Sequence, residues 1–179
     1  MAQITRAIFV GPSLYGVDFK PLATERLLPP ARCGDILQVT GSEHPSQIVL
    51  IDGVFHQDLA VWHKEILYAL LERILVIGAA SMGALRAAEL HQYGMIGIGK
   101  IFEMYINGEE DDSLVAMDFD GRTFQPLRHA PLQHLKADDA LSAIEFARSY
   151  EGTVRCPLDR EQVLPYVERV LERIKCQTM

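Results

Sequence analysis

The segment Ile74–Leu90, "ILVIGAASMGALRAAEL", decides the fold. It opens with a short apolar run typical of a buried strand, and from Met82 its apolar side chains follow helical spacing until Gly94 ends the pattern. The preceding segment, Asp58–Arg73, has the clearest amphipathic helical pattern in the chain, and Asp58 can cap it. Helix, strand and helix in close succession predict an α/β fold, with a central, mainly parallel sheet flanked by helices.

Further strands are predicted upstream. Arg6–Val10 is an apolar run closed by Gly-Pro, and Gln47–Gly53 is a second apolar run that ends in Asp-Gly. The segment between them is less regular. We expect a short helix before Pro29-Pro30, and a strand or a connector over Asp35–Val39.

The pattern changes after Gly94. A short helix is expected within Ile98–Asp112, followed by two short strands around the Asp120-Gly121 turn. Two amphipathic helices follow, over Ala137–Tyr150 and Asp159–Lys175, and Pro165 predicts a late start or a kink in the second. We therefore expect one domain, in which residues 1–119 form the α/β core and residues 120–179 form a hairpin strand and C-terminal helices packed on it.

Composition excludes several classes of protein. A net charge of −7 over 179 residues argues against nucleic acid or an anionic membrane as the main partner. No apolar run is long enough to cross a bilayer, and the first residues do not have the pattern of a signal peptide. Three widely spaced cysteines, Cys33, Cys156 and Cys176, indicate free thiols in a reducing cytoplasm. A persulfide on Cys33 is conceivable, but nothing near it in the sequence supports one.

Ser81 is the candidate nucleophile. It lies where the predicted strand passes into a helix, at the edge of the sheet where open α/β folds bind ligands. The N–H groups of Met82 and Gly83, at the start of that helix, would stabilise an oxyanion. The small neighbours of Ser81 would let a substrate carbonyl approach the backbone. Alternatively, Ser81 is only a helix cap and its small neighbours serve close helix packing.

A serine nucleophile needs a base. The candidates are Lys64, His63, His56, His91, Asp52 and Glu65. Lys64 falls just beyond the apolar arc of its helix, so its amine can reach a partly dry pocket, where desolvation would keep it neutral. The alternative is a surface lysine whose stem covers apolar side chains. His63, inside the apolar arc, is either a core histidine or a substrate contact.

Arg86 is a candidate for binding a substrate carboxylate, or else it pairs with an acid such as Glu89 or Glu65. Asp52, at the end of a strand, is a further candidate for substrate binding, and it orients Lys64 or stabilises a turn. The acidic stretch Gly108–Ser113 is predicted to be a solvated loop or a docking surface, because it lacks the spacing of glycine and ligand residues that a calcium-binding loop has. No metal site and no cofactor are predicted.

Several segments, in order, resemble the core of the TfuA-like family: "IFVGPSL", "CGDI", "IVLIDGVF", "VWHKEILYAL", "VIGAASMGALRAAEL", "YGMIGIGKIF" and "EDDSLVA". The resemblance covers about Ile8–Ala116, and "HKEIL" and "ASMGALRAAEL" are its most distinctive parts.

This resemblance implies a role beside YcaO-domain enzymes, which install thioamides in peptide backbones. The TfuA-like protein would hydrolyse a thiocarboxylated, ThiS-like sulfur carrier with a ubiquitin fold and so supply sulfide. The serine–lysine pair of the family corresponds to Ser81 and Lys64. The expected contacts are therefore a YcaO protein, the carrier and the peptide substrate.

Two other functions fit the sequence. The first is that of a non-catalytic adaptor that brings YcaO, carrier and peptide together. The second is that of a serine hydrolase of small esters or thioesters. Turnover of the carrier by the isolated protein separates the first alternative from the enzyme.

Overall fold

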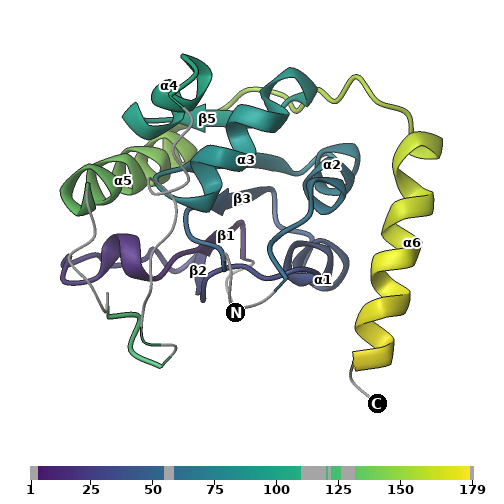
Figure 1. Ribbon diagram of the computed structural model, residues 1–179, viewed down its shortest axis with the longest axis horizontal. Helices are drawn as coiled ribbons and strands as arrows, with labels where there is room; N and C mark the ends of the chain where they lie inside the picture. The colour runs from purple at the N-terminus through teal and green to yellow at the C-terminus, as the bar shows by residue number, and fades with distance from the viewer. Residues whose placement is uncertain (1–3, 55–58, 110–119, 121, 126–131, 178–179) are drawn as a thin grey trace.

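The computed structural model describes residues 4–54, 59–109, 120, 122–125 and 132–177. A five-stranded sheet runs through the centre of the molecule, with helices on both of its faces (Figure 1). The strands are β1 (Arg6–Phe9), β2 (Glu25–Leu28), β3 (Gln47–Leu50), β4 (Leu75–Ala79) and β5 (Ile96–Ile98). Their spatial order is β2-β1-β3-β4-β5, and every neighbouring pair is parallel. The predicted α/β fold is thus confirmed, and the sheet is parallel throughout.

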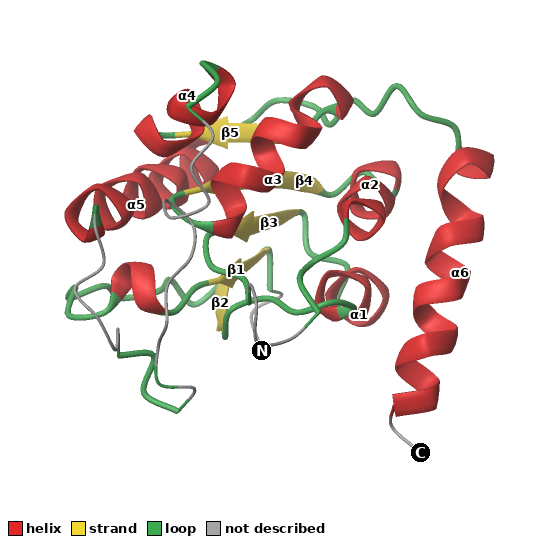
Figure 2. Cartoon of the chain, viewed as in Figure 1, coloured by secondary structure: helices red, strands yellow, loops and turns green. Residues whose placement is uncertain are grey.

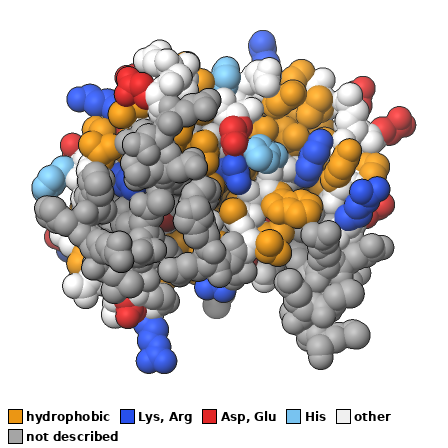
Figure 3. Space-filling view, in the orientation of Figure 1, with side chains coloured by type: hydrophobic (Ala, Val, Ile, Leu, Met, Phe, Trp, Pro, Cys, Tyr) orange, Lys and Arg blue, Asp and Glu red, His pale blue; other side chains and the backbone are white. Residues whose placement is uncertain are grey.

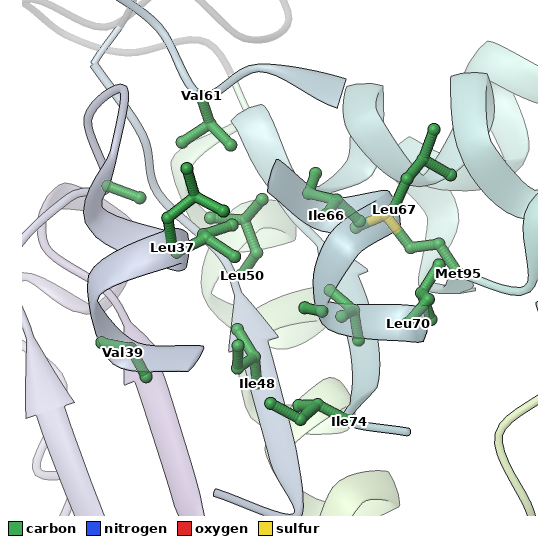
Figure 4. Packing of buried hydrophobic residues seen from close by; sticks show 14 of the residues in the cluster. Leu37, Val39, Ile48, Leu50, Val61, Ile66, Leu67, Leu70, Ile74 and Met95 are labelled. Carbon is green, nitrogen blue, oxygen red and sulfur yellow. The ribbon is translucent and has the colours of Figure 1, made fainter. Parts of the chain in front are cut away.

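One face of the sheet is covered by α1 (Asp35–Ser42), α2 (His63–Leu71) and α3 (Met82–Leu90). Their apolar side chains pack with those of β1, β3 and β4 in the largest buried cluster. Figure 4 shows how Leu37 from α1, Ile66 and Leu70 from α2, and Ile48 and Leu50 from β3 meet in this layer. The Gly94 that ends the helical pattern has a φ of 106°, a conformation that glycine adopts without strain.

The other face is covered by α5 (Gln133–Ser149), with the short 3₁₀ helix η1 (Pro12–Leu14) beside it (Figure 2). Ala140, Ala143, Ile144 and Ala147 of α5 pack on Ile8, Val49 and Ile77 of the strands. Small side chains dominate this stripe, so the helix lies close to the sheet. The sheet is therefore buried on both faces, as expected for parallel strands.

Two more helices complete the molecule. The short α4 (Lys100–Ile106) contacts α3 and α5, and the 3₁₀ helix η2 (His91–Tyr93) extends the end of α3. The last helix, α6 (Arg160–Gln177), runs alongside α2 at the edge of the molecule (Figure 1). Val163 and Val167 of α6 are buried in the largest cluster.

Two expectations for the segments before β3 were wrong, and one strand was missed. Asp35–Val39 is neither a strand nor a connector but the first part of α1, because Ile36, Leu37 and Val39 form one buried side. The segment before Pro29-Pro30 contains an edge strand, β2, instead of a helix. Strand β5 was not predicted, since its three residues, Ile96–Ile98, are too few to form a pattern.

Both of the helices predicted for the C-terminal part of the chain are present in the structure. Helix α5 begins at Gln133, four residues before the predicted Ala137, and α6 begins at Arg160 with Pro165 inside it, so a late start was wrong. Asp58, Gly121 and most of the predicted hairpin lie outside the described residues. Asp120 does form a turn, because its carboxylate accepts the N–H groups of Arg122 and Thr123.

Of the helices in the described ranges, none combines the length and the apolar character needed to cross a membrane.

Candidate functional site

Ser81 lies at the carboxyl edge of the sheet, between the end of β4 and the first residue of α3. It occupies the N-cap position of α3, but its side chain does not make the capping hydrogen bond to that helix. A helix cap is therefore not the role of the hydroxyl in this conformation. The residue is buried, with 4% of its surface exposed, so an acyl substrate can reach it only after a local opening.

The backbone just before Ser81 is strained. Ala80 has a φ of 63°, and the Ser81 N–H donates to the Ala79 carbonyl oxygen across it at 2.9 Å. A hydrogen bond between residues two apart, across a residue with positive φ, is the rare form of the γ-turn. Such strain persists only where the surrounding structure enforces it, and it is concentrated at functional sites.

The glycines around Ser81 serve packing. A Cβ on Gly83 would lie 1.8 Å from the Leu50 carbonyl oxygen, and one on Gly78 would lie 2.1 Å from the Gly83 carbonyl oxygen. Helix α3 thus approaches β3 and β4 more closely than any side chain allows. The alternative that the small residues permit close packing is supported for both glycines.

One of the two expected oxyanion donors is already engaged. The Gly83 N–H already donates to the Ile51 carbonyl oxygen at 3.1 Å, so it cannot stabilise an oxyanion in this conformation. The Met82 N–H donates to none of the described residues. If an oxyanion forms at Ser81, Met82 is the donor that remains from the predicted pair.

Asp52 lies at the same edge, just after β3, and is buried. Its carboxylate accepts the N–H groups of Gly11 and Ser13, at 2.8 and 3.0 Å, and the Ser13 hydroxyl at 2.7 Å. Asp52 therefore fixes the loop that follows β1, as in the prediction that it stabilises a turn. Burial raises the pKa of this carboxyl, and the three hydrogen bonds oppose that rise.

The chain was compared with known proteins. The family model described as "TfuA-like protein" matches residues 52–150, more than half of the chain, from Asp52 through α5. The chain belongs to the TfuA-like family. This family is associated with YcaO-dependent thioamidation. The search of curated proteins found no match.

The matched region differs from the predicted extent of the resemblance. It begins at Asp52, not at Ile8, and it continues past Ala116 to Tyr150. Helix α5, which lies beyond the predicted end of the resemblance, thus belongs to the part that this chain shares with TfuA-like proteins.

The structure does not join Lys64 to Ser81 by a hydrogen bond. The Lys64 ammonium lies over the ring of Tyr166 in α6, 4.5 Å from its centroid, and this is its only interaction with the described residues. In this conformation Lys64 therefore contacts the C-terminal helix. Its role as the partner of Ser81 stays a prediction.

Arg86 and His63 converge on Glu89, one of the two acids predicted as alternative partners of Arg86. Arg86 donates to the Glu89 carboxylate at 2.7 Å and to the Val61 carbonyl oxygen at 2.9 Å. His63 lies 2.7 Å from the same carboxylate oxygen and is 44% exposed, so it is not a core histidine. Burial tends to raise the pKa of Glu89, but the hydrogen bond from His63 and the charge of Arg86 outweigh it and lower that pKa.

The remaining predicted bases lie elsewhere or have other partners. Glu65 is buried at the start of α2 and accepts the N–H groups of Gly34 and Trp62, which ties α2 to the start of α1. His91 contacts the Ala88 carbonyl oxygen in its own helix. His56 lies outside the described residues.

Among the described residues, no group of three or more His, Cys, Asp or Glu side chains is arranged to hold a metal ion. Most of the acidic stretch Gly108–Ser113 lies outside the residues that the structure describes. Neither Cys33 nor Cys156 forms a disulfide with another of the described residues.

Sequence reasoning missed Lys136. This lysine is fully buried on α5, and its amine has no hydrogen-bond partner among the described residues. A signal was present in the sequence. Lys136 continues the spacing of the apolar stripe formed by Ala140, Ala143, Ile144 and Ala147, so a lysine stands where a core side chain is expected.

Proposed function

We propose that this protein hydrolyses a thiocarboxylated, ubiquitin-like sulfur carrier and so supplies sulfide for YcaO-dependent thioamidation of a peptide backbone. Membership of the TfuA-like family supports the pathway. The position of Ser81 supports the chemistry: its hydroxyl does not cap α3, it lies at the ligand-binding edge of a parallel sheet, and it follows a strained residue.

The proposed reaction has two halves. Ser81 Oγ gives its proton to a base and bonds to the thiocarboxylate carbon at the end of the carrier. The carbon–sulfur bond breaks, and sulfide leaves with the proton that the base returns to it. Water then cleaves the acyl-serine, which releases the carrier as a carboxylate and restores the Ser81 hydroxyl.

The Met82 N–H would donate to the oxyanion that forms in each half of the reaction, at the positive end of the α3 dipole. Lys64 is the base that the family resemblance implies. Its amine must first leave the Tyr166 ring, because Nζ lies 4.5 Å from the centroid of that ring.

The test uses purified full-length protein and a thiocarboxylated carrier. Wild-type protein should convert the carrier to its carboxylate, seen by intact mass, and release sulfide in equal amount. Ser81→Ala should lose most of this activity, by about 100-fold or more. Equal rates for the two proteins would refute the role of Ser81.

The adaptor remains a second candidate, favoured by the burial of Ser81, of which only 4% is exposed. Hydrophobic side chains also gather over α2 and α3, with basic and histidine side chains among them (Figure 3). Such a mixed surface is typical of protein contacts. An adaptor would bind the carrier without converting it, and Ser81→Ala would then bind as tightly as the wild type.

A further inference from the structure

Lys136 is an unusual feature of the core. None of its surface is exposed, and it is among the largest fully buried side chains. Lysines are almost never fully buried unless they are paired, yet the Lys136 amine has no hydrogen-bond partner among the described residues. An unpaired buried amine costs stability, so a protein that retains one is expected to use it.

The surroundings of Lys136 place it near Ser81. Its neighbour Leu135 packs against the cluster that contains Met82, and Ala140, one turn further along α5, packs in the cluster that contains Ala80. The residue before Lys136 and a residue one turn after it thus belong to the same two apolar clusters as Met82 and Ala80, the chain neighbours of Ser81.

A second contact brings the start of α5 to the same edge of the sheet. The Gln133 side-chain amide donates to the Pro12 carbonyl oxygen at 2.8 Å, and Pro12 lies next to the Ser13 that binds Asp52. The Asp52 charge in turn acts on Lys136. Ser81, Asp52 and Lys136 therefore share the carboxyl edge of the sheet.

The hydrogen bonds of Asp52 leave Lys136 as the more reactive member of this pair. The Asp52 carboxylate is stabilised by three donors from Gly11 and Ser13, none of them Lys136. Burial lowers the pKa of Lys136, and only the Asp52 charge opposes this. Burial also raises the pKa of Asp52, but three donors already occupy its carboxylate oxygens, so the amine is the group of the pair with a lone pair available to accept a proton.

Other charged groups around α5 have different partners. Asp139 accepts the N–H groups of Lys100 and Ile101 and so caps α4. Among the described residues, the titratable groups on the elements packed against this part of α5 are Asp52 after β3 and Lys100, Glu103 and Tyr105 on α4, and those on α5 itself are His134, Asp138 and Asp139. Of these, Asp52 is the one whose charge acts on Lys136.

We propose that Lys136, in place of Lys64, is the general base that accepts the proton of Ser81, with Asp52 as its positioning residue. This inference rests on the proposed hydrolysis of the carrier. The neutral amine takes the Oγ proton as the oxygen–carbon bond forms. It returns that proton to sulfide as the carbon–sulfur bond breaks, and it acts again on the water that cleaves the acyl-serine.

The test measures sulfide release over a range of carrier concentrations and pH. We compare wild type, Lys136→Met, Lys136→Arg and Lys64→Met with Lys100→Met, an exposed lysine on α4 that serves as the matched control. Folding of each variant is checked by circular dichroism. Both Lys136 variants should lose about 100-fold or more in kcat, because methionine has no proton-accepting group and an arginine stays charged. Their KM should stay within a few-fold of the wild type, Lys64→Met should lose much less, and Lys100→Met should behave as the wild type.

The pH profile separates a base from a structural lysine. In the wild type, kcat/KM should fall on the acid side with one ionisation, and in Lys136→Arg that ionisation should be absent from the residual rate. If the Lys136 variants do not fold, the profile of Lys64→Met decides, since it should retain the acid-side ionisation.

Two results would overturn the assignment to Lys136. One is wild-type kcat in a folded Lys136 variant, and the other is loss of the acid-side ionisation in Lys64→Met. In both cases Ser81→Ala would still be inactive, so the proposed hydrolysis would stand with another base. If wild type and Ser81→Ala instead convert the carrier equally, the proposed function itself fails.

Discussion

At the scale of single residues, the proposed site combines three buried polar side chains, those of Ser81, Asp52 and Lys136. The sequence was sufficient to single out the first two, because side chains at the ends of parallel strands meet at one edge of the sheet. Lys136 was missed because it precedes the predicted helix by one residue and follows a segment without a clear pattern. The pairing of Arg86 with Glu89 was one of the predicted alternatives, because the two residues are three apart in one helix, whereas the bond from Arg86 to Val61 and the donation by the Gly83 N–H depend on tertiary contacts.

Asp52→Asn tests the anchoring role of this residue. The amide nitrogen would face a backbone N–H or the Ser13 hydroxyl in place of a carboxylate oxygen, so at least one buried donor loses its acceptor. The free energy of unfolding should fall by about 1–3 kcal/mol, measured by urea denaturation.

The matched control for this change is Asp138→Asn, at an exposed position on α5. It should change the free energy of unfolding by less than about 0.5 kcal/mol. If Asp52→Asn is as stable as this control, the loop after β1 does not depend on Asp52.

At the scale of elements, the strongest patterns were confirmed as β1, β3, β4, α2 and α3. The failures share a cause. Helix α1 contains Val39, Thr40 and Gly41, which disfavour helix, and burial of one side overrides that preference. Strand β2 lies at the sheet edge, with Arg26 and Leu27 exposed, so it lacks the apolar run of a central strand.

Gly83→Ala tests the close approach of α3 to the sheet. The new Cβ would lie 1.8 Å from the Leu50 carbonyl oxygen, a backbone atom that cannot rotate away. Helix α3 must shift, and the free energy of unfolding should fall by about 3 kcal/mol, measured by chemical denaturation. Sulfide release should fall as well, because the shift displaces Ser81.

Gly41→Ala is the matched control within α1. A Cβ there meets no atom within 4 Å, so only helix propensity changes, and the protein should gain about 0.5–1 kcal/mol. If Gly83→Ala raised the free energy of unfolding as much as Gly41→Ala, the close contact between α3 and β3 would be contradicted.

The ion pairs of Glu25 join the sheet edge to α5. Its buried carboxylate pairs with Arg148 at 2.8 Å and with Arg6 at 3.3 Å. The hydrogen bond from Arg148, which is the largest contribution, and the arginine charges lower the pKa of Glu25 although burial opposes them. Glu25 therefore binds a proton less readily in the folded chain than in the unfolded chain, and its contribution to stability should be lost as the pH falls.

This contribution should be fully present above the ordinary glutamate pKa of about 4.3 and should decline as the pH falls through the lower folded value. We expect Glu25→Gln to be about 1–3 kcal/mol less stable than the wild type at pH 7. The difference should shrink below about pH 4, as measured by urea denaturation across pH. A constant difference at all pH values would contradict the lowered pKa.

At the scale of the whole molecule, the two faces of the sheet are covered by different helices. One carries α1, α2 and α3, with α6 outside them, and the other carries α5, the helix that contains Lys136. The family match ends with α5, at Tyr150, so α6 is an addition outside the matched region.

Val163→Ala tests whether α6 belongs to the cooperative unit. Val163 is fully buried in the largest cluster, so its truncation should lower the free energy of unfolding by about 2 kcal/mol, with a single transition. Glu168→Ala, at an exposed position of the same helix, should change it by less than about 0.5 kcal/mol. Equal stability of the two variants would show that α6 is not part of the unit that unfolds.

The central claim, that Ser81 attacks the end of the sulfur carrier, is tested most directly by trapping the acyl-enzyme. Full-length protein is mixed with thiocarboxylated carrier and quenched with acid within the first turnover, and the products are digested and sequenced by tandem mass spectrometry. The account predicts the C-terminus of the carrier in an ester with Ser81 in the wild type, and no adduct in Ser81→Ala. An adduct on another residue, or an undiminished first turnover of sulfide by Ser81→Ala, would contradict it.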